Sequence, residues 1–330
     1  MSQTVFGDIS PRVAAHAQVK LLSRGIPYLC LEQFGQGAPV PTRSSKTTKF
    51  RRYESFPATP SALTEGVTPS ARKLTNTDIT ATLAQYGDRV EITDVIMDTH
   101  EDPVLAEATD ILGEQAANML ETVRYNVIKA GSNVVYSGAA VSRVTVLAVM
   151  SLTTQRKVVR LLKRQNARKV TRALKSTPNY ATQPVNAAYI GVCHPDCEND
   201  IRDMAGFVPV ENYGQMTPYE GEIGKCEEVR YIVSTVFTSF ADAGAALGGN
   251  SRISTGGTNC DVYPILFFGQ DAYGIVPLRG KSSITPMVVN PTPSDSDPLA
   301  QRGHVGWKAW QTAAILNDAW LVRAEVAATA

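Results

Sequence analysis

The sequence has 330 residues, of which 43% are hydrophobic and 19% charged, and its formal net charge is +1. Single cores stop growing at roughly 250–300 residues, so this length predicts two or three cores, and the composition excludes a disordered chain. The near-neutral balance excludes a globally basic or acidic protein, and five scattered cysteines indicate a reducing compartment rather than a disulfide framework.

The charges are nevertheless sorted along the chain. No Asp or Glu occurs between Glu121 and Asp196, although Lys and Arg recur there. Residues 196–228 reverse this balance, with Arg202 and Lys225 as the cations among many acids. Such segregation predicts surfaces of opposite sign that meet within a subunit or between subunits.

Residues 1–45 are predicted to form an arm. Gly and Pro recur from Gly25 to Pro41 too often for a compact element, yet residues 21–34 include several large apolar side chains. An arm with such side chains lies against another surface, and a neighbouring subunit is one candidate.

Neither secretion nor a membrane span is expected. The first ten residues lack a basic region followed by an apolar run. The apolar stretch at 134–152 is interrupted by Ser137, Gly138, Arg143 and Ser151, whereas a span needs about 20 mostly apolar residues.

Residues 46–96 read as a long hairpin. Its first strand alternates basic and aromatic side chains, namely Lys49, Phe50, Arg51, Arg52, Tyr53 and Phe56. Pro and Gly mark the far end, and the return over 78–96 is rich in Ile, Thr, Leu and Val with period-two stretches. A hairpin this long cannot bury itself on its own sheet, so it must project, and its open edges need a partner.

Residues 102–131 carry the marks of one long helix. Asp102 can cap the first free N–H groups, Pro103 suits the first helical position, and Gly131 supplies a left-handed stop. Apolar residues recur at a spacing of three and four along the stretch. At about 1.5 Å per residue the helix would be roughly 40 Å long, so other segments must lean on it.

Residues 152–174 predict a second helix, with one apolar face and one basic face. The basic residues of this segment, here taken as 152–175, are Arg156, Lys157, Arg160, Lys163, Arg164, Arg168, Lys169, Arg172 and Lys175.

Short apolar strands follow, separated by turns. They are expected at 186–192, 229–236, 265–268 and 272–276, with a helix from 194 to 204, a Gly- and Ala-rich loop at 241–259 and a Pro- and Ser-rich connection at 285–298. Residues 306–326 are apolar and aromatic, which favours a final pair of core strands.

This order of elements resembles the major capsid proteins of tailed double-stranded-DNA phages. Several ordered stretches are similar to one podophage-type branch of that family, among them QYGDRVEITDV, DPVLAEATDILGEQAANMLETVRYNVIKAGSNVVYSG, PDCENDIRDMAGFVPVENYG, GEIGKCEEVRYIVS, DVYPILFFGQDAYGIVPLRG and QRGHVGWKAWQTAAILNDAWLVR. The resemblance covers nearly the whole chain, although correspondence is weaker over 237–263 and 152–175.

The resemblance implies an α+β capsid fold in five parts. They are an N-terminal arm (1–45), an E-loop hairpin (46–96), a P-domain (97–180) with the spine helix 102–131, an A-domain (181–298) and C-terminal strands (299–330) that return to the P-domain. It also implies a structural subunit that forms hexamers and pentamers of an icosahedral shell around double-stranded DNA. Portal and scaffolding or decoration proteins would be its partners, the virion capsid its location and the host bacterial cytoplasm its place of assembly.

Two clusters could carry other chemistry, but each has a structural explanation that we favour. Cys193, His194, Cys197 and Cys226 offer zinc-ligand types, yet a strand end followed by a buried cysteine in a helix explains them as well. Asp98, His100, Glu101 and Asp102 suit a helix N-terminus, where the dipole favours acids. We therefore expect no catalytic residue, cofactor or metal, with an α/β enzyme around 193–226 as the less favoured rival.

Basic residues carry the binding hypotheses. Within segment 152–175, the candidates Arg160, Lys163, Arg164, Arg168 and Lys169 would meet either an acidic protein surface or DNA phosphates, and we place the acidic surface first. No aromatic residue is interleaved there, so base stacking is unsupported. A nucleic-acid-binding module remains the alternative function.

In the hairpin, Lys46, Lys49, Arg51 and Arg52 are expected to meet acids on a neighbour. Phe50, Tyr53 and Phe56 would be anchors in that contact, unless they pack across the strands of the hairpin itself.

Overall fold

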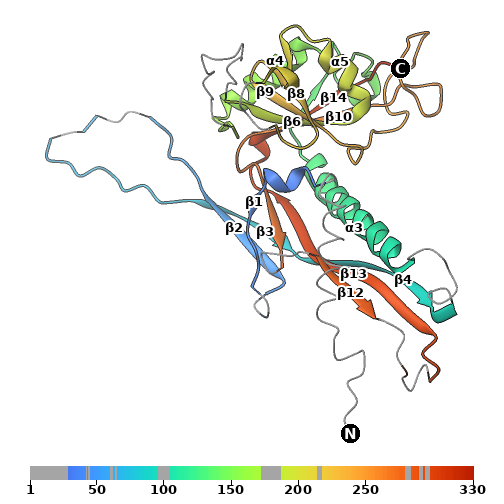
Figure 1. The fold of residues 1–330 in the computed structure, drawn as a ribbon. Helices are drawn as coiled ribbons and strands as arrows, with labels where there is room; N and C mark the ends of the chain where they lie inside the picture. The colour runs from blue at the N-terminus through green and yellow to red at the C-terminus, as the bar shows by residue number, and fades with distance from the viewer. Residues whose placement is uncertain are drawn as a thin grey trace, which may run out of the picture.

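The structure is a computed structural model that describes residues 29–41, 43, 45–59, 62–63, 65–95, 104–171, 187–213, 218–278, 284–289, 293 and 298–330. An upper sheet with short helices and a lower sheet with one long helix form the body, and a hairpin projects from their junction (Figure 1). Helices and strands thus both contribute, as the α+β expectation requires.

The upper sheet has the strand order β5-β14-β10-β6-β9-β8-β7. Its strands are β5 (Val134–Tyr136), β6 (Tyr189–Cys193), β7 (Phe207–Pro209), β8 (Glu222–Cys226), β9 (Val229–Val233), β10 (Tyr263–Phe268) and β14 (Leu321–Val326). β6 and β10 are buried along their whole length, because helices cover one face and the junction with the lower sheet covers the other.

The lower sheet has the order β1-β11-β13-β12, and β4 pairs with the other edge of β13. Its strands are β1 (Gln36–Gly37), β4 (Ala84–Thr93), β11 (Tyr273–Pro277), β12 (Ile284–Val289) and β13 (Arg302–Ile315). β12 occupies part of the stretch that we expected to be a connection. Its Thr, Met and Val residues pair antiparallel with β13 in spite of the prolines around them.

The spine helix α3 (Val104–Lys129) packs on the lower sheet. Its Leu112 and Ala116, which the apolar spacing placed on one face, meet β13 residues in one apolar cluster that also contains Leu120. Residues 102 and 103 lie outside the described part, so the predicted cap does too. Gly131 is not left-handed. It is instead a close-packing glycine, since a Cβ there would lie 3.0 Å from both Asp318 Oδ1 and Leu321 Cδ2.

The end of the arm lies against its own subunit. The 3₁₀ turn η3 (Leu31–Gln33) and β1 place Leu31, Phe34 and Val40 in buried positions, and β1 runs parallel to β11. Tyr273 Oη donates to the carbonyl of Leu31 at 2.6 Å. Residues 1–28, which include most of the predicted arm, lie outside the described part.

The return strand of the hairpin is shorter than predicted. Among the described strands, β2 (Thr47–Tyr53) pairs with β3 (Asn76–Thr82) alone, and the rest of the predicted return is β4, which pairs with β13 over ten positions. Leu83 separates the two strands and is buried, with its N–H donating to Lys46 O at 2.9 Å. The alternating pattern of 84–93 suits any antiparallel partner, so it did not reveal which strand would pair with it.

The second helix, α4 (Leu152–Arg164), ends ten residues before the predicted end. Asn166 adopts a left-handed φ of 54°, its N–H bonds Lys163 O, and Ala167 N bonds Leu162 O, which together form a Schellman stop. Arg168 and Lys169 therefore lie in an irregular segment, and residues 172–175 lie outside the described part.

α4 and α5 (Glu198–Arg202) cover the same face of the upper sheet. Val158 and Leu162 of α4 share a core cluster with Cys197 and Ile201 at α5. α4 thus packs on the sheet of the expected A-domain, whereas the resemblance implies a P-domain at 97–180 that includes α4.

A buried polar network joins α3, the arm end and β13. Glu121 accepts the N–H of Leu31 at 2.7 Å. Arg124 donates to Glu121 at 3.4 Å, to Glu32 at 3.0 Å and to Gln311 at 3.1 Å. Burial raises the pKa of Glu121, and the charge of Arg124 opposes that shift.

Replacing Arg124 with Ala should lower the free energy of unfolding by about 3–5 kcal/mol, because it leaves Glu121 as a buried carboxylate without its cation. Asn126→Ala, at an exposed position of the same helix, should change it by less than about 0.5 kcal/mol. Chemical denaturation followed by circular dichroism measures both. Equal effects of the two substitutions would contradict the role given to Arg124.

Candidate functional site

The root of the hairpin is fixed by Phe50. This side chain is half-buried and packs on a cluster that includes Val40, Leu83 and Val276 of its own subunit. Its ring fills the space above Gly274 of β11, where a Cβ would lie 2.8 Å from Phe50 Cζ. Phe50 therefore anchors the hairpin to its own lower sheet, which differs from the predicted place at a neighbour.

Arg51 is also satisfied within the hairpin. It donates to Asp78 across the β2–β3 pair, with Nε to Oδ1 at 2.8 Å and Nη2 to Oδ2 at 2.9 Å. The hydrogen bond from Arg51 lowers the pKa of Asp78 to about 2. Lys49 and Arg52 line a small groove of about 350 Å³ beneath the hairpin root, next to Asp271 and Trp320.

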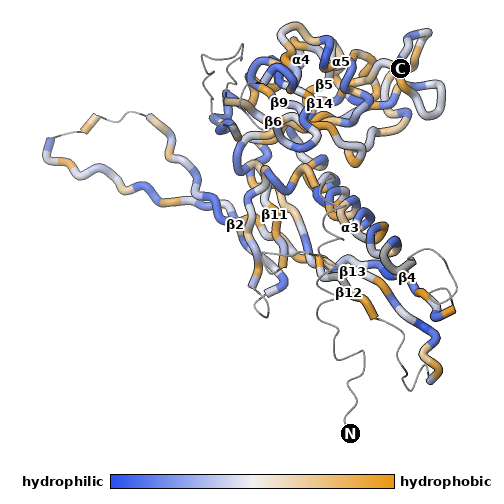
Figure 2. The backbone as a smooth tube through the Cα atoms, viewed as in Figure 1, coloured by the Kyte–Doolittle hydropathy of each residue, from blue (hydrophilic) through white to orange (hydrophobic). Residues whose placement is uncertain are grey.

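Beyond the root, the hairpin is uncovered. Every described residue from 51 to 76 is exposed, including the predicted anchors Tyr53 and Phe56. Three aliphatic side chains of the loop are also exposed, namely Leu63 at 76%, Val67 at 63% and Leu74 at 64%. Figure 2 shows hydrophobic residues scattered along this loop, far from either core.

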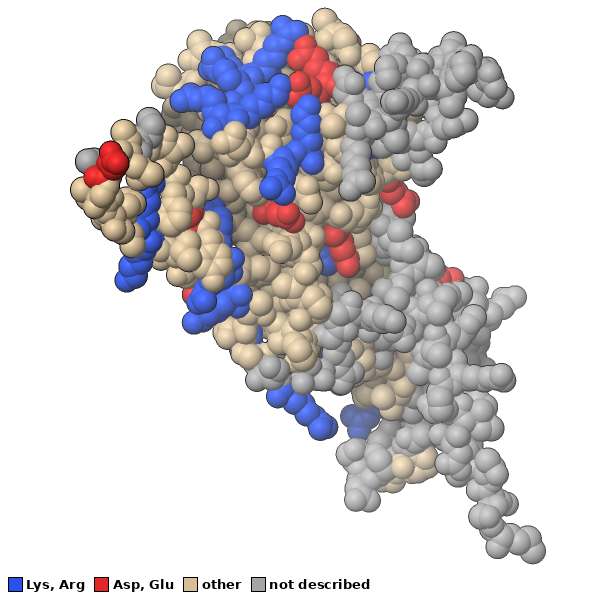
Figure 3. All heavy atoms as spheres, turned by 90° about the vertical axis from the view of Figure 1, so that its left-hand side faces the viewer, with Lys and Arg blue, Asp and Glu red and all other residues tan. Residues whose placement is uncertain are grey.

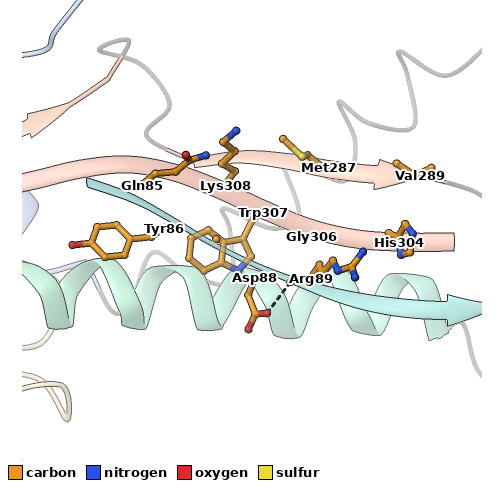
Figure 4. A pocket seen from close by; sticks show the side chains of 11 residues that line it. Gln85, Tyr86, Asp88, Arg89, Met287, Val289, His304, Gly306, Trp307 and Lys308 are labelled. Carbon is orange, nitrogen blue, oxygen red and sulfur yellow. Dashed lines mark hydrogen bonds between the residues drawn. The ribbon is translucent and has the colours of Figure 1, made fainter. Parts of the chain in front are cut away.

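A trough runs along β4, β13 and β12. Its volume is about 650 Å³. Trp307 and Asp88 point toward α3, whereas Lys308 and Met287 point to the opposite side of the sheet (Figure 4). Met287 and Val289 are exposed apolar side chains on this side. The sequence patterns did not predict the trough, because the trough forms only when β12 is a strand and these residues were expected to be a connection.

The basic surface of α4, defined here as Arg156, Arg160, Lys163 and Arg164, lines a groove of about 430 Å³ with Val159, Glu227 and Glu228. Figure 3 shows Lys and Arg side chains gathered on the upper layer, beside acids, on the side from which the hairpin projects.

Two carboxylates in the β8–β9 turn hold part of this surface. Arg156 pairs with Glu227, and Glu228 accepts from Lys163 at 2.7 Å and lies 3.1 Å from Lys169. Burial works against ionisation of Glu228, but its bonds from Lys163 and Lys169 hold its pKa below the ordinary value. The predicted pairing of basic segment with acidic segment therefore occurs within one subunit for these residues.

Other predicted cations are placed differently. Within the described residues, the side chains of Arg160 and Arg164 form no hydrogen bond or ion pair, and both are exposed. The backbone of Arg168 accepts from Gln270 N at 2.9 Å, which ties its segment to the end of β10. Arg160 and Arg164 are thus the cations of this surface that lack a carboxylate in the described part of their own chain.

The cysteine cluster lies in the upper core. Cys193, Cys197 and Cys226 are buried among apolar side chains, and burial raises the pKa of each thiol. His194 Nδ1 accepts from Asp196 N at 3.3 Å and starts the turn before α5. Among the described residues, no group of three or more His, Cys, Asp and Glu side chains is arranged to hold a metal ion.

Two further expectations concern the acidic cluster before the spine helix and a membrane span. Asp98, His100, Glu101 and Asp102 lie outside the described residues. In the part of the chain that is described, no helix is both long and apolar enough to cross a membrane.

Comparison with known proteins decides the family. The sequence profile described as "Phage capsid protein" matches residues 76–324, from β3 into β14. The chain belongs to the phage capsid protein family. A search of curated proteins found no match.

Solved phage capsids share the fold of this capsid protein. The capsid of Ralstonia phage GP4 aligns with a TM-score of 0.66 and 13% identity, over 90% of this chain and 87% of that one. The cyanophage Pam1 capsid gives 0.61 and 14%, over 93% of both chains. The capsid of cyanophage P-SCSP1u gives 0.58 and 13%, over 91% and 89%.

The resemblance to tailed-phage major capsid proteins is therefore confirmed, and so is the fold expected from it. The capsid protein is a structural protein of a phage capsid shell built from many copies. Its candidate surfaces for contact with other copies are the exposed hairpin loop, the trough and the basic surface of α4.

Gly274→Ala should loosen the hairpin root, because the new Cβ would meet Phe50 and Leu316 at 2.8 and 3.3 Å. Hydrogen–deuterium exchange in β2 and β3 should become faster while exchange in β10 stays unchanged. Gly37→Ala is the matched control, since its Cβ would meet nothing within 4 Å. Unchanged exchange at the hairpin root in Gly274→Ala would contradict the anchoring role of Phe50.

Asp78 should titrate near pH 2, as followed by the chemical shift of its carboxyl carbon. A carboxyl whose pKa is lowered by folding stabilises the hairpin above its unfolded pKa of about 3.9, and that contribution is lost as the pH falls through about 2. Arg51→Gln should move the midpoint back toward about 3.9. A midpoint that does not move would show that Arg51 is not the cause.

Proposed function

We propose that the chain self-assembles as hexamers and pentamers into an icosahedral shell that encloses double-stranded DNA. The uncovered hairpin loop carries this proposal. A projecting, edge-exposing ribbon with exposed apolar side chains is a liability for a monomer and is expected to be covered by a partner. In a shell of many copies, that partner is the next subunit.

The trough is the surface that we propose for this contact. It is open on the side of the lower sheet away from α3 and presents Met287 and Val289, whose exposed side chains match the aliphatic residues of the loop. A loop of one copy lying over the trough of the next would bury both apolar sets. Tyr53 and Phe56 would then be anchors in a contact with the neighbour, while Phe50 fixes the hairpin root to its own subunit.

Assembly would follow from many such contacts. Each subunit both extends a hairpin and receives one, so the same pair of surfaces recurs around a ring. Overlapping extensions bury more area than the roughly 1,600 Å² of a standard pair. We place the assembled shell in the virion and its assembly in the host bacterial cytoplasm, with portal and scaffolding or decoration proteins as further partners.

A loop deletion tests the proposal. Residues 55–74 are replaced by Asn-Gly, which can close the β2–β3 pair with a two-residue turn next to the bonded residues Glu54 and Thr75. The variant should remain folded by circular dichroism, because the loop is exposed throughout its described residues, but it should form no shells in negative-stain microscopy. The unmodified chain should form shells, rings or hexamer sheets.

Leu63→Ser with Val67→Ser and Leu74→Ser separates apolar burial from loop length. This triple variant keeps the loop and should also fail to close shells. Shells of normal size and yield from the deletion variant would refute the role of the hairpin. An unmodified chain that stays a small monomer would refute self-assembly by this chain.

A further inference from the structure

We propose that the basic surface of α4 binds carboxylates on a second copy of this chain, within the same ring that the hairpin builds. The inference rests on the proposed function and assigns a second contact to it. Its occupant is the acidic segment after α5 on the neighbouring subunit, in preference to DNA.

The basic surface of the upper layer and the hairpin lie on the same side of the molecule. The hairpin projects to one side of the molecule (Figure 1), and the cations of the upper layer gather on that same side (Figure 3). If the hairpin reaches the next subunit from this side, the same subunit also faces α4. The upper layers of two neighbours are then brought together by the contact that joins their lower layers.

The groove beside α4 has more cations than its own carboxylates hold. The carboxylates Glu227 and Glu228 already hold Arg156, Lys163 and Lys169. Arg160 and Arg164 line the same groove and make no ion pair with any described residue. The groove therefore has two spare guanidinium groups, which can each bind a carboxylate in a bidentate fashion.

The basic surface of α4 is held rigidly by both ends of the helix and by the core beneath it. Ser151 caps α4 by accepting from Thr154 N at 3.3 Å, and the Schellman stop at Asn166 closes its other end. Val158 and Leu162 are fully buried beneath the helix. Because the helix is fixed before binding, less conformational entropy is lost when a partner docks.

The composition of the groove favours protein over DNA. Glu227 and Glu228 already pair with Arg156, Lys163 and Lys169, so the positive charge left for a partner is two discrete guanidinium groups rather than a continuous row that could follow a phosphate backbone. Val159 also lines the groove, which gives the contact an apolar part. The exposed face of α4 carries no aromatic side chain for stacking on bases.

The same chain offers matching carboxylates. Asp203, which directly follows α5, and Glu211, in the turn η6 (Val210–Asn212), are exposed and make no side-chain hydrogen bond or ion pair with any described residue. They belong to the acidic segment 196–228. A rotation that relates neighbours in a ring joins different surfaces of the two copies, so α4 of one can meet this segment of the next.

Charge reversal at Arg160 and Arg164 tests the inference in the full chain. Arg160→Glu with Arg164→Glu should leave the fold unchanged by circular dichroism and abolish shells, or shift their formation to much higher protein concentration. Lys157→Glu is the matched control, since Lys157 is exposed on the same helix but does not line the groove. The control should assemble like the unmodified chain.

A compensating variant identifies the partner. Asp203→Arg with Glu211→Arg should also impair assembly, and joining it to the Arg160 and Arg164 reversals should restore shells. Loss of assembly without restoration would overturn the assignment of these carboxylates. Normal shells from the Arg160 and Arg164 variant would overturn the inference as a whole.

Nucleic acid is measured in the same particles after nuclease treatment. Shells of normal size that hold less nucleic acid would overturn the inference in favour of DNA contact. If the unmodified chain assembles and the variant does too, only this inference fails. If the unmodified chain forms no shells, rings or sheets, the proposed function fails with it.

Discussion

The buried ion pair between Glu121 and Arg124 is the constraint on which the rest of the molecule depends. Both side chains are almost fully inaccessible, and their partners come from three separate parts of the chain, namely the arm end, the spine and β13. Removing two charges from water costs several kcal/mol per ion, so the pair is weak support for stability by itself. It instead ties the three parts together, because Leu31, Glu32 and Gln311 all bond to these two side chains of the spine.

That arrangement determines where the hairpin points. Glu121 fixes Leu31, and the chain then passes through β1, which pairs with β11 beside Gly274. Phe50 sits on that glycine a short distance further along the chain. The spine is therefore linked to the hairpin root by a series of contacts through the arm end and the lower sheet, on which Phe50 also packs directly. A subunit with a misplaced arm end would also present its hairpin in a different direction.

The two layers share strands, which makes the body a single frame. β10 continues into β11 and β13 into β14, so each connection crosses from one sheet to the other within a few residues. Arg323 strengthens this junction by donating to carbonyls at the end of α3 and to Glu325. The hairpin root packs on the lower sheet, and these main-chain connections join that sheet directly to the upper one.

Sequence patterns predicted the elements whose signal is local. α3 has a long apolar period, and β13 with β14 form one long apolar and aromatic run, so both were predictable. The end of α4 was missed because a left-handed Asn gives a weaker signal than Gly. β12 was missed because Pro286 within it and the prolines after it outweighed its Val and Met residues. Pairing of β4 depends on a partner more than 200 residues away, which periodicity cannot reveal.

For the candidate surfaces, too, the local features were predictable and the partners were not. The alternation around Phe50 places it on one face of the hairpin but does not say whose surface lies beneath, and only the contact with Gly274 answers that. Likewise, composition separates basic from acidic segments without showing which charges pair within the subunit. Buried or half-buried cations such as Arg124, Arg143 and Arg230 have carboxylates in their own chain. The cations of the α4 groove that lack one are exposed.

This contrast separates charges that hold the fold from charges available to a neighbour. An exposed ion pair contributes roughly 0–1 kcal/mol, so no single contact of this kind could hold two subunits together. Repetition changes the balance, since each subunit in a closed shell is held by several neighbours at once and the contacts act as a multivalent set. Weak individual contacts also allow a wrongly placed subunit to leave before the shell closes. Exposed cations beside a long, uncovered hairpin are therefore suited to a protein whose function is assembly.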